Sequence, residues 1–127
     1  MSKILIIEDD DVARELMRML LVSRGHDVAV AENGVQGYDT ALIVEPELII
    51  TDIQMPGADG VHVVRRVRST PSLQNTPILV TTAFGTGTAT FSLQAGADAY
   101  EPKPLNPKNF LATIERLLAT RNNVKAA

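Results

Sequence analysis

Residues 48–52 of this chain read LIITD, an apolar run that ends in a threonine and a carboxylate. Continuous apolar runs are typical of strands covered on both faces, as the central strands of a parallel sheet are. Residues 4–7 and 78–80 have the same character, whereas residues 28–31 and 99–101 are shorter or less apolar, as edge strands tend to be. The sequence therefore predicts five strands, with the three continuous runs at the centre of one sheet.

Segments with helical spacing separate these runs, which is the alternation expected of repeated βα units. Placing the two edge-type strands outermost gives the strand order 2-1-3-4-5. This order defines a flavodoxin-like doubly wound α/β fold, a five-stranded parallel sheet with five helices. The helices are expected over residues 11–24, from Asn33 to the residues before 45–46, from 59–60 to the residues before 70–71, over 84–95, and from Asn106 onward.

Three of these helices carry more specific predictions. The first is expected to end at Gly25 and to bury Val12, Leu16, Met19 and Leu20. The third is expected to present a solvated face that contains Arg65, Arg66 and Arg68. The fourth, over 84–95, begins with glycines and threonines, which are poor helix formers. A short and mobile helix is expected there, and a rigid segment held by tertiary packing is the alternative.

Composition and charge narrow the class of protein. The chain has 127 residues, 45% of them hydrophobic and 21% charged, as expected of one globular domain. A net charge of −3 without a basic stripe argues against direct nucleic-acid binding, and the absence of cysteine excludes disulfides and thiolate chemistry. No stretch has the length or apolarity of a membrane span or a signal peptide, so a cytoplasmic location is expected. The domain is expected over residues 1–120, with 121–127 as a flexible tail or the start of a linker.

Polar residues follow the expected strands where their carboxyl ends meet, which is where open α/β sheets bind ligands. They are Glu8, Asp9, Asp52, Thr82 and Lys103. Like charges ~4 Å apart cost about 4 kcal/mol at an effective dielectric constant near 20, so a cation must offset the acids. Mg²⁺ suits such carboxylates and completes its shell with water and phosphate oxygens. Asp52 would then act as a nucleophile toward phosphorus, with Lys103 stabilising the transferring group and Thr82 bonding a phosphoryl oxygen.

An ordered set of motifs resembles the receiver domain of two-component response regulators, from Lys3 to about Ala119. Each motif is weak evidence alone, but the whole set at the correct strand ends is highly specific. The motifs are the acidic pair 8–9, the acceptor segment 51–57 with Asp59 and Gly60, the pair Thr82 and Ala83, and the pair Lys103 and Pro104.

The resemblance implies a phosphoacceptor that takes a phosphoryl group on Asp52 from the phosphohistidine of a histidine kinase or a histidine phosphotransfer protein. It implies a Mg²⁺ site formed by Asp9, Asp52 and the backbone carbonyl of Gln54, with Glu8 contributing through water. It also implies a phosphate-binding role for Lys103 and a switch that consists of Thr82 and Tyr100. The switch would change the surface of the fourth helix, fifth strand and fifth helix, where an unknown target protein binds.

Such a domain is not a turnover enzyme, but it catalyses its own phosphorylation and dephosphorylation. Slow dephosphorylation is expected, because Phe84 stands where a water-positioning side chain is found in similar receivers. An aspartate-nucleophile phosphatase is disfavoured, since its second aspartate would fall at Gln54, and the acidic residues 8–11 would repel a flavin phosphate. A stand-alone regulator, a fragment of a larger response regulator or hybrid kinase, and plain edge-strand packing of Tyr100 remain open alternatives.

Overall fold

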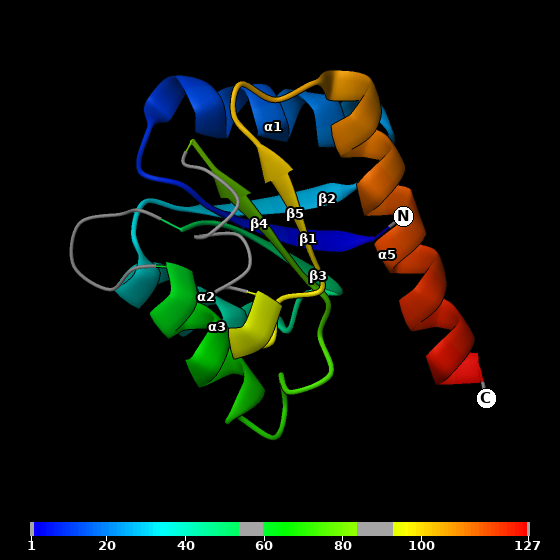
Figure 1. Ribbon diagram of the computed structural model, residues 1–127. Coiled ribbons are helices and arrows are strands. Elements are labelled where there is room, and N and C mark those ends of the chain that lie inside the picture. Colours follow the sequence, from blue (N-terminus) through cyan, green and yellow to red (C-terminus); the bar gives the residue numbers. More distant parts are fainter. Residues whose placement is uncertain (1, 54–59, 84–92, 127) are drawn as a thin grey trace.

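The computed structural model describes residues 2–53, 60–83 and 93–126, with the side chains of 121–126 excepted. Its centre is one parallel sheet with the order β2-β1-β3-β4-β5, which confirms the predicted doubly wound topology (Figure 1). The strands are β1 (Lys3–Ile7), β2 (Asp27–Ala31), β3 (Leu48–Asp52), β4 (Ile78–Thr82) and β5 (Ala99–Pro102). In this order the strand sequence reverses between β1 and β3, so a ligand crevice is expected at their carboxyl ends.

Helices cover both faces of the sheet. They are α1 (Asp11–Ser23), α2 (Gly34–Val44), α3 (Gly60–Arg68) and α5 (Pro107–Ala126). Figure 1 shows α1 and α5 on one face and α2 and α3 on the other. The expected fourth helix falls mostly on residues 84–92, outside the described residues; residues 93–95 are helical and lead to Gly96, whose φ is 123°. The assignment of 121–127 to a tail or linker stays a prediction.

The core has one apolar layer on each side of the sheet. β3 and β4 are buried along their whole length, which explains the unbroken apolar runs 48–50 and 78–80. One layer joins the sheet to α2 and α3, and the other joins it to α1 and α5, with Phe110 and Ile114 of α5 fully buried. Among the described residues, no helix is long and apolar enough to cross a membrane.

The predicted buried face of α1 is wrong. Val12 and Met19 are 78% and 57% exposed, whereas Met17 and Leu21 are fully buried. Leu16 is also exposed and Leu20 is only half-buried. The helix carries apolar side chains on two sides, so spacing alone is compatible with either side facing the sheet.

The prediction that the arginines of α3 form a solvated face is correct for Arg65 and Arg66, which are exposed, and wrong for Arg68. The Arg68 guanidinium donates to the backbone carbonyls of Gln74, Thr76 and Gly96, and it forms an ion pair with Asp98 at 2.7 Å. Arg68 therefore ties the end of α3 to the loops before β4 and β5.

Candidate functional site

The predicted polar residues meet at the carboxyl edge of the sheet. Hydrogen bonds extend the ladder past the strand ends, from the Glu8 amide to Ala31 and from the Lys103 amide to Thr82, at 3.0 and 2.8 Å. Since Ile7 pairs with Thr51 in register, Glu8 comes to lie beside Asp52 at the β1–β3 switch point. Parallel pairing thus brings together side chains that are up to 95 residues apart in sequence.

Carboxylates from two strand ends share this site. Glu8, Asp9 and Asp52 each offer an oxygen, and these oxygens lie within 4.8 Å of one another. Glu8 is fully buried and Asp52 is 7% exposed, while Asp9 faces solvent. Hard, closely spaced oxygen donors with one solvent-facing member fit a divalent cation that retains water, as Mg²⁺ does.

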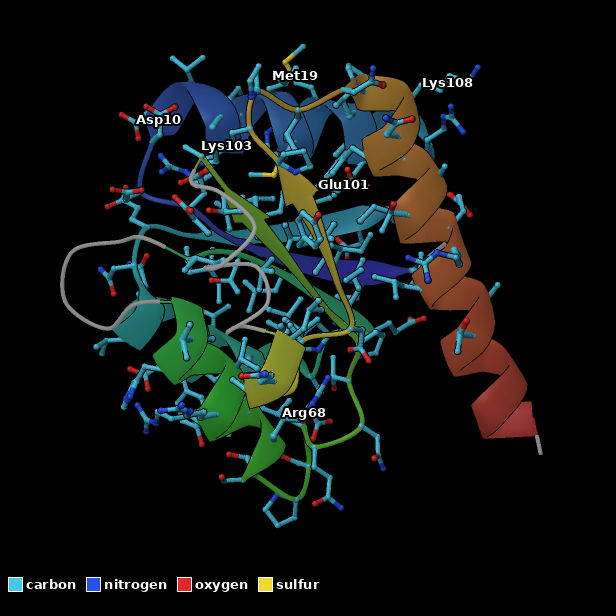
Figure 2. All side chains as sticks on the ribbon, viewed as in Figure 1. Asp10, Met19, Arg68, Glu101, Lys103 and Lys108 are labelled. Carbon is cyan, nitrogen blue, oxygen red and sulfur yellow. The ribbon has the colours of Figure 1, made fainter. Side chains whose placement is uncertain are left out.

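Lys103 reaches into the same site from the end of β5. Its Nζ donates to Glu8 Oε1 at 2.5 Å and to Asp52 Oδ2 at 3.1 Å. In Figure 2, Lys103 lies at the same end of the molecule as Asp10, next to the start of α1. The peptide bond between Lys103 and Pro104, just past the end of β5, is cis. One ammonium thus contacts two of the three clustered carboxylates.

The electrostatics show that this cluster is short of positive charge. Burial raises the pKa of Glu8 from 4.5 to about 7, because the Lys103 hydrogen bond opposes the burial penalty only in part and the Asp52 charge adds to it. Burial acts against the charged form of Lys103 as well, but its hydrogen bonds to Glu8 and Asp52 outweigh that effect and raise the pKa of Lys103. A bound dication would supply the missing charge.

Two neighbouring features hold the acids in place. Asp10 caps α1 by accepting a hydrogen bond from the Ala13 amide at 2.7 Å, so α1 begins directly after the acidic pair. Arg14, one turn into α1, donates to the Glu8 carbonyl at 2.8 Å. The cap follows from the sequence pattern, but the arginine contact does not, because it depends on the angle between β1 and α1.

Gly60, which belongs to the predicted acceptor motif and to the predicted start of the third helix, lies against the backbone of the acceptor strand. A Cβ at Gly60 would lie 2.2 Å from the Asp52 carbonyl oxygen, far inside van der Waals contact. The first turn of α3 therefore packs directly on the backbone of Asp52, and the Gly60 amide bonds the Ile53 carbonyl at 2.8 Å. A glycine just after the acceptor segment was the available signal.

The two proposed switch residues lie in different environments. Thr82 is buried at the end of β4, and Tyr100 on β5 is 39% exposed. Ala83, next to Thr82, is exposed. Gln54 and Phe84 lie outside the described residues, so their predicted roles in metal binding and phosphoryl lifetime stay predictions.

Residues 4–115 match the family described as "Response regulator receiver domain". The chain belongs to this family, the receiver domains of two-component response regulators. It is also 38% identical over 117 residues to the response regulator MprA of Mycobacterium sp. (strain KMS), a match that covers 91% of this chain and 50% of MprA. The chain thus spans about half the length of the curated relatives it matches.

Solved structures agree on the fold. A putative response regulator from Chloroflexus aurantiacus superposes with a TM-score of 0.89 at 32% identity, covering 93% of this chain and 98% of that chain. The receiver domain of the sensor histidine kinase PA1611 from Pseudomonas aeruginosa has a TM-score of 0.87 at 27% identity, with coverage of 93% and 98%. That structure contains a magnesium ion coordinated in its active-site cleft.

Proposed function

We propose that this chain is a phosphoacceptor whose Asp52 receives a phosphoryl group from a phosphohistidine. The observation that carries the proposal is a nearly buried Asp52 carboxylate, held by Lys103 beside the acids Glu8 and Asp9. An Asp52 oxygen forms a bond to phosphorus while the phosphorus–nitrogen bond breaks, and the imidazole nitrogen keeps the electron pair and takes up a proton. Lys103 stabilises negative charge on the transferring oxygens.

The same acids form the proposed magnesium site. Asp9, Asp52 and the Gln54 carbonyl would hold the ion, with Glu8 contributing through water. When bound, Mg²⁺ neutralises charge on the phosphoryl oxygens. The magnesium in the Pseudomonas aeruginosa receiver supports this assignment, as does the close spacing of the acidic oxygens here.

The consequences of phosphorylation form the second part of the proposal. Thr82 bonds a phosphoryl oxygen and moves inward, and Tyr100 follows from its half-exposed position, which changes the surface of the fourth helix, β5 and α5. The domain catalyses this phosphorylation and a slow dephosphorylation of itself, and it does not turn over a separate substrate. Its phosphodonor is a histidine kinase or a histidine phosphotransfer protein.

The curated relatives are about twice as long as this chain, so the same receiver is compatible with a larger response regulator. The likeness to the receiver of a sensor histidine kinase is equally compatible with a hybrid kinase. The cytoplasmic location expected from the sequence stays a prediction.

The decisive experiment is phosphorylation with acetyl phosphate and Mg²⁺, followed by intact-mass measurement. The wild-type chain is expected to gain one phosphoryl group, and Asp52→Asn is expected to gain none. Asp39→Asn, which removes an exposed acid on α2, is the matched control and should be labelled like the wild type. Full labelling of Asp52→Asn would disprove the assignment, and fast hydrolysis of acetyl phosphate with no lasting phosphorylated chain would instead favour the phosphatase alternative.

A further inference from the structure

Thr81 lies in the middle of the sheet between two acidic strand positions. Its Cα pairs in register with Asp52 on β3 and with Glu101 on β5. The residues two positions earlier on these three strands all pack in the apolar layer with α1 and α5. Because side chains alternate along a strand, Asp52, Thr81 and Glu101 project to that same face.

The Thr81 hydroxyl has an unusual environment. Thr81 is fully buried, and its Oγ1 has no hydrogen-bond partner among the described residues. Buried hydroxyl groups are normally paired, because an unmade hydrogen bond in the interior is costly. Thr51, equally buried on β3, donates to the backbone carbonyl of Asp52 at 3.0 Å. Within the described ranges, Thr81 is therefore a hydrogen-bond donor without an acceptor, and it lies in register between two carboxylate positions.

Glu101 links this row of side chains to α5. Its Oε1 accepts a hydrogen bond from the Thr113 hydroxyl of α5 at 2.5 Å. Figure 2 shows Glu101 on β5 beside that helix. A carboxylate has a second oxygen, which is able to accept another donor. The polar side chains at Asp52, Thr81, Glu101 and Thr113 thus form a row from the acceptor to α5, next to an otherwise apolar layer.

We propose that Thr81 is a positioning residue whose hydroxyl couples the state of Asp52 to Glu101 and α5. The inference rests on the proposed phosphorylation of Asp52. A hydroxyl has one proton and donates to one carboxylate at a time. In the part of the chain that the structure describes, the hydroxyl is bonded to neither carboxylate, so the stronger acceptor attracts it. The free Asp52 carboxylate competes with Glu101 for this donor, but after phosphoryl transfer the bonded Asp52 oxygen belongs to an acyl phosphate and accepts weakly. The hydroxyl then turns to Glu101 by a change of rotamer, and the Glu101–Thr113 contact carries the change to α5.

The path through Thr81 and Glu101 lies on the opposite face of the sheet from the proposed switch residues Thr82 and Tyr100. Thr82 and Tyr100 alternate with Thr81 and Glu101 along β4 and β5, so they project to the opposite face. Substitution of Thr81 therefore separates the two paths. A valine at position 81 keeps the shape of the side chain and removes only the hydroxyl.

The test is to record amide chemical shifts before and after addition of beryllofluoride with Mg²⁺, a stable mimic of the phosphoryl group. In the wild type, shifts are expected near Asp52 and also at Glu101 and Thr113. In Thr81→Val, the shifts near Asp52 should persist, while those at Glu101 and Thr113 should fall by at least half. Thr81→Ser, which restores a hydroxyl, should recover them, and Thr51→Val is the matched buried control that should keep them.

The outcomes separate the coupling from the proposed function. Wild-type shifts at Glu101 and Thr113 in Thr81→Val, or an equal loss in Thr51→Val, would overturn the coupling and leave phosphorylation intact. A wild-type chain that responds nowhere to beryllofluoride would refute the proposed function, and the coupling with it. Glu101→Gln tests the same contact from the other strand if Thr81→Val does not fold, and it should likewise reduce the Thr113 shift.

Discussion

Two centres, each built around a partly buried cation, stand at opposite ends of the sheet, one around Lys103 and one around Arg68 (Figure 2). At the amino end, the Arg68 guanidinium bonds three backbone carbonyls and Asp98, which itself also accepts from the Ile78 amide at 2.8 Å. At the carboxyl end, Lys103 contacts Glu8 and Asp52 within a cluster of three acids. The first centre is balanced in charge, and the second has an excess of negative charge.

One centre holds the fold together and the other carries the proposed chemistry. Arg68 joins α3 to two loops, and its charge is matched by one carboxylate and several carbonyl dipoles. At the Lys103 centre, burial of Glu8 and the neighbouring Asp52 charge outweigh the hydrogen bond from Lys103 and raise the pKa of Glu8 to about 7. Uncompensated acids at the Lys103 centre are expected to lower the stability of the fold until a cation binds there or Asp52 is phosphorylated.

The largest expected effect is on the rate of phosphorylation, and it distinguishes the role of Lys103 from that of Arg68. Lys103→Met should slow phosphorylation by acetyl phosphate by about 100-fold or more, because it removes a charged donor from the transferring oxygens. Arg68→Met should leave the phosphorylation rate within about twofold, yet lower the free energy of unfolding by roughly 1 to 3 kcal/mol through lost hydrogen bonds. Initial rates of labelling and urea denaturation measure the two quantities.

Equal rate losses in the two variants would contradict the division into a reactive and a structural centre. A loss of stability in Lys103→Met is compatible with it, since buried Glu8 would lose its contact with the ammonium. The rate comparison is therefore made at a temperature at which both variants are folded, as judged by circular dichroism.

Metal addition gives the next largest effect. Mg²⁺ at ~100 times its Kd should stabilise the native chain by about 2.7 kcal/mol, because it binds the folded state. Asp9→Ala should lose this stabilisation, and Asp98→Ala, which removes the acid of the Arg68 centre, should keep it. Melting temperature with and without Mg²⁺ is the measurement. Retention of the metal effect in Asp9→Ala would remove Asp9 from the metal site.

Much of the fold could be predicted from local pattern. The unbroken apolar runs of β1, β3 and β4 identify central strands, and the topology follows from that placement. The buried face of α1 could not be predicted in this way. Val12 and Met19 form an apolar side of the helix that is as plausible a buried face as the side with Met17 and Leu21, which is the one that is buried. Only packing on the sheet selects between them.

The candidate site shows the same limit. The clustering of Glu8, Asp52 and Lys103 follows once the strand order is known, since each residue follows a strand at the same edge. Two features depend on distances between elements that no motif encodes: the Gly60 contact, and the lack of a partner for the Thr81 hydroxyl among the residues that the structure describes. Ion pairing of Arg68 was missed for the same reason, because Asp98 is 30 residues away.

The raised pKa of Glu8 predicts a pH dependence of stability in metal-free protein. The folded pKa, about 7, exceeds the ordinary value of 4.5, so the folded state binds more protons between these limits. The resulting stabilisation is present below pH 4.5 and is lost as pH rises through about 7. The expected loss from pH 5 to pH 8 is about 2 kcal/mol, as an order of magnitude.

Urea denaturation across this pH range, without metal, measures that loss. Glu8→Gln carries no titrating group at position 8 and should show a flatter profile than the wild type. Asp98→Asn at the balanced centre should leave the loss unchanged. A wild-type stability that rises from pH 5 to pH 8, with the same rise in Glu8→Gln, would contradict the charge imbalance inferred for the Lys103 centre.

The smallest expected effect compares two helix caps, one of which borders the acidic cluster. Asp10 caps α1 and Asn33 caps α2, each by accepting a backbone amide hydrogen bond within its first turn. Asp10→Ala and Asn33→Ala should each cost about 1 kcal/mol of stability. Only Asp10→Ala should also weaken Mg²⁺ binding by a few fold, because α1 positions the residues that precede it and Asp10 adds negative charge there. Calorimetric titration of both variants with Mg²⁺ distinguishes them, and an equal loss of affinity would mean that the caps act through overall stability alone.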